Sequence, residues 1–194
     1  MTQTIDKFIE KIKTSTKKTL QDNFRIELTS ETKKTLDNLN EQDTNIHYDF
    51  AVNFYLFDTH IGEARLDVFE TEVHGAKKRI DWYNFHPLIK FNYEDGETKN
   101  KLERNNIGTL AHITTLLYLH KKRDLDPNIN LEYKNPSDSG KSHLNKMNIS
   151  YEEYEDEDKE GITLITSLRS DLISAIKYTN SVGFEFENPF QYKE

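Results

Sequence analysis

The chain begins with apolar residues that recur at helical spacing. They are Ile5, Phe8, Ile9 and Ile12. Charged side chains fill most positions between them, which predicts an amphipathic helix with one face against a partner surface. Further along, FRIEL at 24–28 alternates as a short strand does, and the polar segment 30–42 starts with Ser30, a common N-cap residue. We therefore expect a short strand followed by a polar helix or loop.

From residue 46 the pattern changes to the alternation that is typical of strands. Two such segments, 46–57 and 61–73, are separated by the three residues 58–60, which is the length of a hairpin connection. A third strand is predicted over 79–94, where Pro87 indicates a bend or an edge position. Together these segments predict an antiparallel meander.

The second half of the chain alternates between helix and strand patterns. Apolar residues cover most of the circumference of a helix predicted over 107–122, so this helix is expected to lie largely buried against a sheet. A strand is predicted over 128–133, and a short helix follows near Pro136, a residue suited to a first helical turn. The segment 162–180 predicts a strand-to-helix or an all-helical element, and 182–190 a terminal strand.

These elements predict a mixed α/β protein whose central, mostly antiparallel sheet is flanked by helices. With 194 residues and 35% hydrophobic content, the chain is long enough for one core with an added arm. We expect a boundary near residue 43, with an N-terminal helical arm at 1–43 and an α/β domain at 44–194.

Composition narrows the range of functions. A net charge of -8 argues against a dominant nucleic-acid-binding surface, because phosphate binding needs a concentrated excess of Lys and Arg. The chain has no cysteine, which excludes disulfides, thiolate catalysis and cysteine-based zinc sites. Its start lacks the apolar run of a secretion signal, and no stretch approaches the roughly 18 apolar residues of a membrane helix. We expect a cytoplasmic protein without a membrane segment.

The seven histidines show no metal-binding pattern. No His-x-x-x-His pair occurs, and His112 and His120 lie about two turns apart on the predicted helix, too far to chelate one ion directly. We expect the histidines at surface or strand-end positions and no metal site. The acidic run EEYEDEDKEG at 152–161 is predicted to be a solvated loop, with a surface for a basic partner or a mimic of nucleic-acid charge as the alternatives.

The turn before the predicted buried helix reads ERNNIGTL, residues 103–110. Unpaired amides and the helix dipole favour an anion at such a position. The turn resembles the Arg/Gln-x-x-Gly-x-Gly/Ala motif of the GCN5-related N-acetyltransferase family, which presents backbone N–H groups to the pyrophosphate of acetyl-CoA. Glu103, Asn106 and Gly108 then stand at the first position and at the two glycines, and the order of elements over 46–150 is similar to that family's central part.

The resemblance implies an acetyltransferase-like fold with acetyl-CoA bound at this turn. The residues that it assigns to cofactor binding are Arg104, Asn106, Ile107, Gly108 and Thr109. Asn tolerates the left-handed backbone conformation better than most residues, so Asn106 is compatible with a glycine position. The alternative is an ordinary helix start with Asn105 or Asn106 as N-cap and no ligand.

A second motif of that family runs Asn-x-x-Ala-x-x-x-Tyr-x-x-x-Gly-Phe, where the tyrosine is often placed to protonate the departing thiolate. The matching residues here are Ser137, Gly140, Leu144, Asn148 and Ile149. Leu144 cannot transfer a proton, and the adjacent His143 is rotated about 100° around the helix and is expected to face elsewhere. The resemblance also allows a base from the central strands, where nothing selects among Glu63, Glu70 and His86.

Two functions follow as expectations. The first is a divergent acetyltransferase-like protein that transfers an acyl group from acetyl-CoA to an amine, with its catalytic residues undetermined. The second is a non-enzymatic interaction or regulatory protein on a degenerate acetyltransferase-like fold, with a protein partner or a second copy of the chain.

Overall fold

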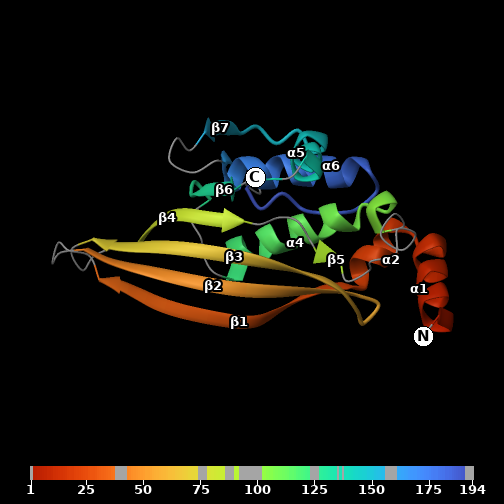
Figure 1. Ribbon diagram of the computed structural model, residues 1–194. Coiled ribbons are helices and arrows are strands. Elements are labelled where there is room, and N and C mark those ends of the chain that lie inside the picture. The colour runs from red at the N-terminus through yellow and green to blue at the C-terminus, as the bar shows by residue number, and fades with distance from the viewer. Residues whose placement is uncertain are drawn as a thin grey trace.

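The computed structural model describes residues 2–37, 43–73, 78–85, 90–91, 102–122, 127–134, 136, 138–155 and 161–190. The helices are α1 (Thr2–Thr14), α2 (Lys17–Asp22), α4 (Ile107–Lys122), α5 (Asp138–Lys146) and α6 (Leu168–Ser181). The strands are β1 (Phe24–Asp37), β2 (Asp43–Leu56), β3 (Thr59–Val73), β4 (Lys78–Phe85), β5 (Lys90–Phe91), β6 (Asn130–Lys134), β7 (Glu152–Glu155) and β8 (Ile162–Ser167). Figure 1 shows their arrangement. The predicted mixed α/β class is confirmed.

The strands form one sheet in the order β1-β2-β3-β4-β6-β8-β7, with β5 paired to β3. Within the described ranges, every pairing is antiparallel except that of β4 with β6, which runs parallel through Tyr83 with Leu131 and Asn84 with Glu132. We call this parallel pairing the seam, because it joins two antiparallel parts of the sheet. A right-handed crossover through α4 is the usual connection between such parallel neighbours.

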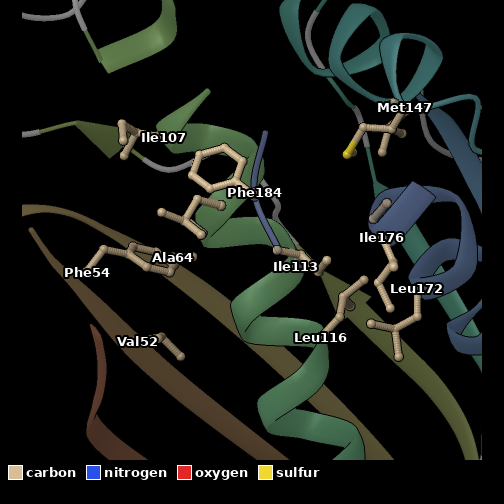
Figure 2. Packing of buried hydrophobic residues seen from close by; sticks show 14 of the residues in the cluster. Val52, Phe54, Ala64, Ile107, Ile113, Leu116, Met147, Leu172, Ile176 and Phe184 are labelled. Atoms are coloured by element: carbon tan, nitrogen blue, oxygen red, sulfur yellow. The ribbon is translucent and has the colours of Figure 1, made fainter. Parts of the chain in front are cut away.

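The buried apolar residues that the structure describes form one core between the sheet and the helices (Figure 2). Val52 and Phe54 of β2 and Ala64 of β3 contribute from the sheet, and α4 contributes a row of buried residues that includes Ile113 and Leu116. The predicted bounds of α4, 107–122, are confirmed, as is its burial. An apolar pattern around the whole helix arises because α4 packs against both the sheet and α6.

The β2–β3 hairpin is confirmed, but its turn is shorter than predicted. β3 starts at Thr59, so only Phe57 and Asp58 connect the strands. Both residues have positive φ angles, 50° and 62°, as a two-residue type I′ turn requires. The Phe57 ring packs beside the core and lies under the Lys11 ammonium group at 3.9 Å.

The prediction for the segment after FRIEL was wrong over 30–37. These residues continue β1, which pairs with β2 as far as Asp37 with Thr44, and 38–42 lie outside the described residues. The strand forms because β2 supplies a hydrogen-bonding partner along its whole length. Figure 1 shows that β1, β2 and β3 extend past the helices at this end, so the strand needs no apolar face to pack there.

The C-terminal predictions need two further corrections. The segment 162–180 is a strand followed by a helix, but 182–190 contains no strand. Its backbone folds back on α6 instead, with the Phe184 N–H donating to the Thr179 carbonyl at 3.1 Å and the Phe186 N–H to the Asn180 side chain at 2.8 Å. The acidic run also starts as a strand, because 152–155 form β7 with exposed side chains, while 156–160 lie outside the described residues.

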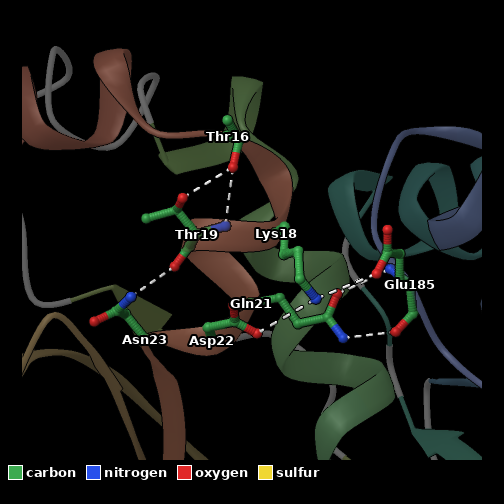
Figure 3. A network of polar contacts seen from close by, with 7 residues as sticks. All are labelled: Thr16, Lys18, Thr19, Gln21, Asp22, Asn23 and Glu185. Carbon is green, nitrogen blue, oxygen red and sulfur yellow. Dashed lines mark hydrogen bonds and ion pairs between the residues drawn. The ribbon is translucent and has the colours of Figure 1, made fainter.

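The N-terminal helices belong to the same core as the rest of the chain. Phe8, Ile12 and Leu20 are buried in the shared cluster. Figure 3 shows how α2 is tied to the C-terminal segment: Gln21 exchanges two hydrogen bonds with the backbone of Glu185, and Lys18 pairs with its carboxylate at 3.2 Å. The expected boundary near residue 43 stays a prediction, but the arm is not purely helical, since it contains β1.

Candidate functional site

The start of α4 follows a turn at Asn105 and Asn106. Asn106 has a left-handed backbone with φ 59°, and its N–H donates to the Glu103 carbonyl at 3.0 Å. Leu110 makes the first bond of the helix, by donating to the Asn106 carbonyl at 3.0 Å. The amides of Ile107, Gly108 and Thr109 come before this bond and therefore have no acceptor within α4. Such amides attract an anion.

The five residues assigned to cofactor binding fall within or beside this turn, but they are not equally accessible. Arg104 is exposed, and Asn106 and Gly108 are half-buried. The side chains of Ile107 and Thr109 are buried, so only their backbone is available to a ligand. A Cβ atom on Gly108 would come into van der Waals contact with the His143 ring, which lies 3.9 Å from that position.

Two lysines and a tyrosine converge on the same turn. The Lys17 ammonium donates to the Asn105 carbonyl at 2.7 Å, and Lys146 and Tyr178 donate to Asn106 Oδ1 at 3.1 and 3.3 Å. Asn106 is therefore not a side-chain N-cap, because its oxygen points to α5 and α6 instead. Burial lowers the pKa of Lys17, and the positive charge of Lys146 lowers it further.

Sequence patterns did not indicate this cluster. Lys17 comes from α2, Lys146 from α5 and Tyr178 from α6, so only the packing of four helices brings them to the start of α4. Each is an ordinary polar residue on an amphipathic helix. The sequence predicted only the turn, and the three side chains that contact it come from other helices.

A buried polar network lies close to the turn. His112 Nε2 is 2.9 Å from Asp171 Oδ1, and the Tyr133 hydroxyl donates to Asp171 Oδ2. All three side chains are buried, so the expectation of a surface or strand-end position was wrong for His112. The carboxylate needs these two partners because an ionised group in a core is otherwise strongly destabilising. Burial, followed by the Asp171 charge, raises the pKa of Tyr133 and keeps its hydroxyl a donor.

His143 connects this network with the turn. Its ring stands edge-on to that of His112, with centroids 5.8 Å apart, and it is the nearest group to the position of a Cβ atom on Gly108. Burial, the neighbouring His112 and the charge of Lys146 lower the pKa of His143 to about 3. The ring is therefore neutral at physiological pH. A neutral imidazole can accept or donate a hydrogen bond, but it does not add positive charge to the site.

The segment compared with the second motif has leucine, which cannot donate a proton, at residue 144. Leu144 is fully buried in the core, Asn148 has a positive φ of 54°, and Ile149 is buried. Of the base candidates, Glu63 is exposed on β3, and Glu70 lies on the same strand. His86 lies outside the described residues. The positions of these residues do not distinguish which of them could act as a general base.

Comparison with known proteins does not assign the chain to a family: no family model, no curated protein and no solved structure matches it. Among the described residues, no group of three or more His, Asp or Glu side chains is arranged to hold a metal ion. None of the helices in the described ranges is both long enough and apolar enough to cross a membrane.

Proposed function

We propose that this chain is a divergent acetyltransferase-like protein that binds acetyl-CoA through its phosphate groups at the start of α4. The observation that carries the proposal is the convergence of Lys17 and Lys146 on a helical turn whose first amides have no acceptor within the helix. Two cations and a helix N-terminus together suit a pyrophosphate, which carries more charge than one lysine neutralises. Gly108 has no side chain that would shield its backbone N–H from a phosphate.

The order of the elements supports the same proposal. Antiparallel strands lead into the buried helix α4, the strand β6 and the short helix α5, which is the succession that the resemblance to GCN5-related N-acetyltransferases implies. The left-handed backbone at Asn106 and Asn148 adds to this support, because both stand where that family's motifs have glycine.

The residues of the chain have separate parts in this proposal. Acetyl-CoA, when bound, supplies an activated acetyl group. Lys17, Lys146 and the amides of the turn hold the phosphates, and an amide of a central strand polarises the thioester carbonyl. Leu144 contributes no proton, so transfer to an amine takes place without a general acid at this position.

Ligand-induced stabilisation tests the proposal. Acetyl-CoA at millimolar concentration is expected to raise the melting temperature, since a ligand that binds only the native state stabilises it by mass action. Lys146→Met should weaken binding about tenfold in calorimetry, because one charge-assisted contact is lost. The matched control is Lys177→Met, an exposed lysine on α6 for which unchanged affinity is expected. An unchanged melting temperature in the presence of acetyl-CoA would remove the proposal.

A second function is favoured by the burial of Leu144. A fold that keeps the phosphate turn but lacks the proton donor is suited to a non-enzymatic role, as an interaction or regulatory protein that binds a partner or a second copy of itself. This candidate predicts that acetyl-CoA raises the melting temperature of the protein. It also predicts that mass spectrometry detects no acetylated product when the protein and acetyl-CoA are incubated with a panel of primary amines. Transfer to one of these amines would exclude it.

A further inference from the structure

The C-terminal segment 183–186 lies against α2, the helix that carries Lys17. Figure 3 shows the contacts between them: the Gln21 side chain donates to the Glu185 carbonyl at 2.7 Å and accepts from the Glu185 N–H at 2.9 Å. Lys18 adds an ion pair with the Glu185 carboxylate at 3.2 Å. Because two of these bonds use the backbone of Glu185, they fix the path of the chain at this residue as well as its side chain.

The core and α6 hold the same segment from its other neighbours. Phe184 is 2% exposed and belongs to the buried cluster that contains Ile107 at the start of α4. Both side chains are labelled in Figure 2. The Phe184 N–H donates to the Thr179 carbonyl at 3.1 Å, and the Asn180 side chain bonds the backbone of Phe186 at 2.8 and 2.9 Å. The segment therefore has a defined position between α2 and α6.

Gly183 lies where this segment meets the side chain of Lys17. Its φ is 96°, a conformation that residues with a side chain rarely adopt. A Cβ atom on Gly183 would lie 3.3 Å from Lys17 Cγ and 3.7 Å from Lys17 Cβ. The first distance is shorter than the optimum of about 3.5–4.0 Å between carbon atoms. The lysine stem can therefore lie against the backbone here because residue 183 has no side chain.

From this contact Lys17 reaches the turn before α4. Its ammonium group lies over the Phe184 ring, 5.5 Å from the centroid, and donates to the Asn105 carbonyl at 2.7 Å. An ammonium group is attracted to the face of an aromatic ring. A lysine side chain is flexible and loses much rotamer entropy when it is held in one position. The groups that confine its stem therefore determine where its charge is placed.

We propose that Gly183 and Phe184 position Lys17 for the anion at the start of α4, and that the C-terminal segment thereby contributes to the affinity of the phosphate site. This role rests on the proposed function. Its physical basis is preorganisation, because a cation that is already held in place loses less entropy when the anion binds. Gly183 and Phe184 are positioning residues, since they act through Lys17.

Calorimetry of the full chain with inorganic pyrophosphate at low ionic strength tests this role. Lys17→Met should weaken binding about tenfold, because one charge-assisted contact is lost while the aliphatic stem is kept. Gly183→Ala should weaken binding about fivefold, because its Cβ displaces that stem. Lys177→Met makes the same charge change at an exposed residue of α6 outside the site and should leave the affinity unchanged.

The double variant Lys17→Met/Gly183→Ala separates positioning from a general disturbance of the structure. If Gly183 acts through Lys17, its substitution should change the affinity by less than about twofold once Lys17 is replaced. Backbone strain at residue 183 should lower the melting temperature equally in both backgrounds, so stability alone does not produce this difference.

Phe184→Leu is a second variant that leaves the glycine in place. It removes the ring beneath the ammonium group and keeps an apolar side chain in the core. Binding of pyrophosphate should weaken about twofold to threefold in the parent background. With Lys17→Met, the same substitution should have no further effect on the affinity.

Two results would overturn the positioning role and leave the phosphate site intact. One is that Gly183→Ala and Phe184→Leu both bind pyrophosphate with the affinity of the parent protein. The other is that these substitutions weaken binding equally with and without Lys17. If the parent protein does not bind pyrophosphate, the proposed phosphate site and the positioning role are both wrong.

Discussion

Asp171 is a buried carboxylate that two hydrogen bonds make compatible with the core. A carboxylate in a core is tolerated only when hydrogen bonds replace water, and here His112 and Tyr133 provide them. These directional hydrogen bonds orient α6 relative to α4 and β6, in addition to the apolar contacts of the core. His143 then lies between this network and the start of α4, so the ionisation of one ring affects both the core and the candidate site.

The low pKa of His143 predicts a loss of stability in acid. The pKa of His143 is about 3 in the folded protein and about 6.5 in the unfolded chain. Between pH 6.5 and pH 3, the unfolded chain therefore binds a proton at this residue that the native state does not bind. The free energy of unfolding should therefore fall as the pH drops from 6.5 towards 3, by up to about 4 kcal/mol from this residue. Urea unfolding at a series of pH values measures it.

The matched variant is His143→Gln, which keeps a polar side chain but cannot be protonated in this range. Its free energy of unfolding should depend less steeply on pH between 6.5 and 4 than that of the parent protein. Equal slopes for the two proteins would show that His143 does not ionise as its surroundings indicate.

At the scale of elements, the left-handed residue before α4 controls how the helix begins. Asn106 has φ 59°, a conformation that disfavours residues with an ordinary Cβ. We expect Asn106→Ala to reduce the free energy of unfolding by about 1–2 kcal/mol, through backbone strain and the loss of the acceptor for Lys146 and Tyr178.

Asn106→Gly separates the two causes. Glycine adopts the same φ without strain, so only the side-chain acceptor is lost, and this variant should be more stable than Asn106→Ala. Thermal and urea unfolding of both variants give the comparison. If the glycine variant is the less stable of the two, backbone conformation is not what asparagine provides at this position.

The elements differ in how well the sequence predicts them, and the reason is physical. α4 was predicted with its observed bounds because a helix buried on several sides must be apolar on several sides. The strand over 30–37 was missed because its order comes from pairing with β2 and not from its own side chains. The alternating pattern over 182–190 predicts a strand, but hydrogen bonds from the Asn180 side chain hold this segment in an irregular path.

The candidate site was predictable in one respect only. ERNNIGTL predicts the turn from local sequence, and Asn106 adopts the left-handed φ that asparagine tolerates better than most residues. Lys17, Lys146 and Tyr178 are brought to it by tertiary packing, and the pairing of His112 with Asp171 joins residues of different helices. A single sequence has no periodicity that reports contacts of this kind.

On the scale of the whole molecule, the shared core predicts that removal of the N-terminal helices lowers the stability of the remaining chain. Phe8, Ile12 and Leu20 are buried, and each buried apolar side chain of this size contributes about 1.5–3 kcal/mol. A chain that starts at residue 24 should therefore have a melting temperature at least several degrees lower, or should not unfold cooperatively. Calorimetry of the shortened and full chains tests this, and equal melting temperatures would support an independent arm.

The seam has a consequence for the order in which the molecule assembles. The β2–β3 and β7–β8 hairpins are formed by neighbouring segments, whereas Tyr83 and Leu131 are far apart along the chain and must close a long loop to meet. The two residue pairs of the seam stabilise the chain too little to offset this loss of chain entropy until α4 and α6 pack in the core. We expect the backbone amides of the seam to gain protection from hydrogen exchange last during refolding, after both hairpin regions.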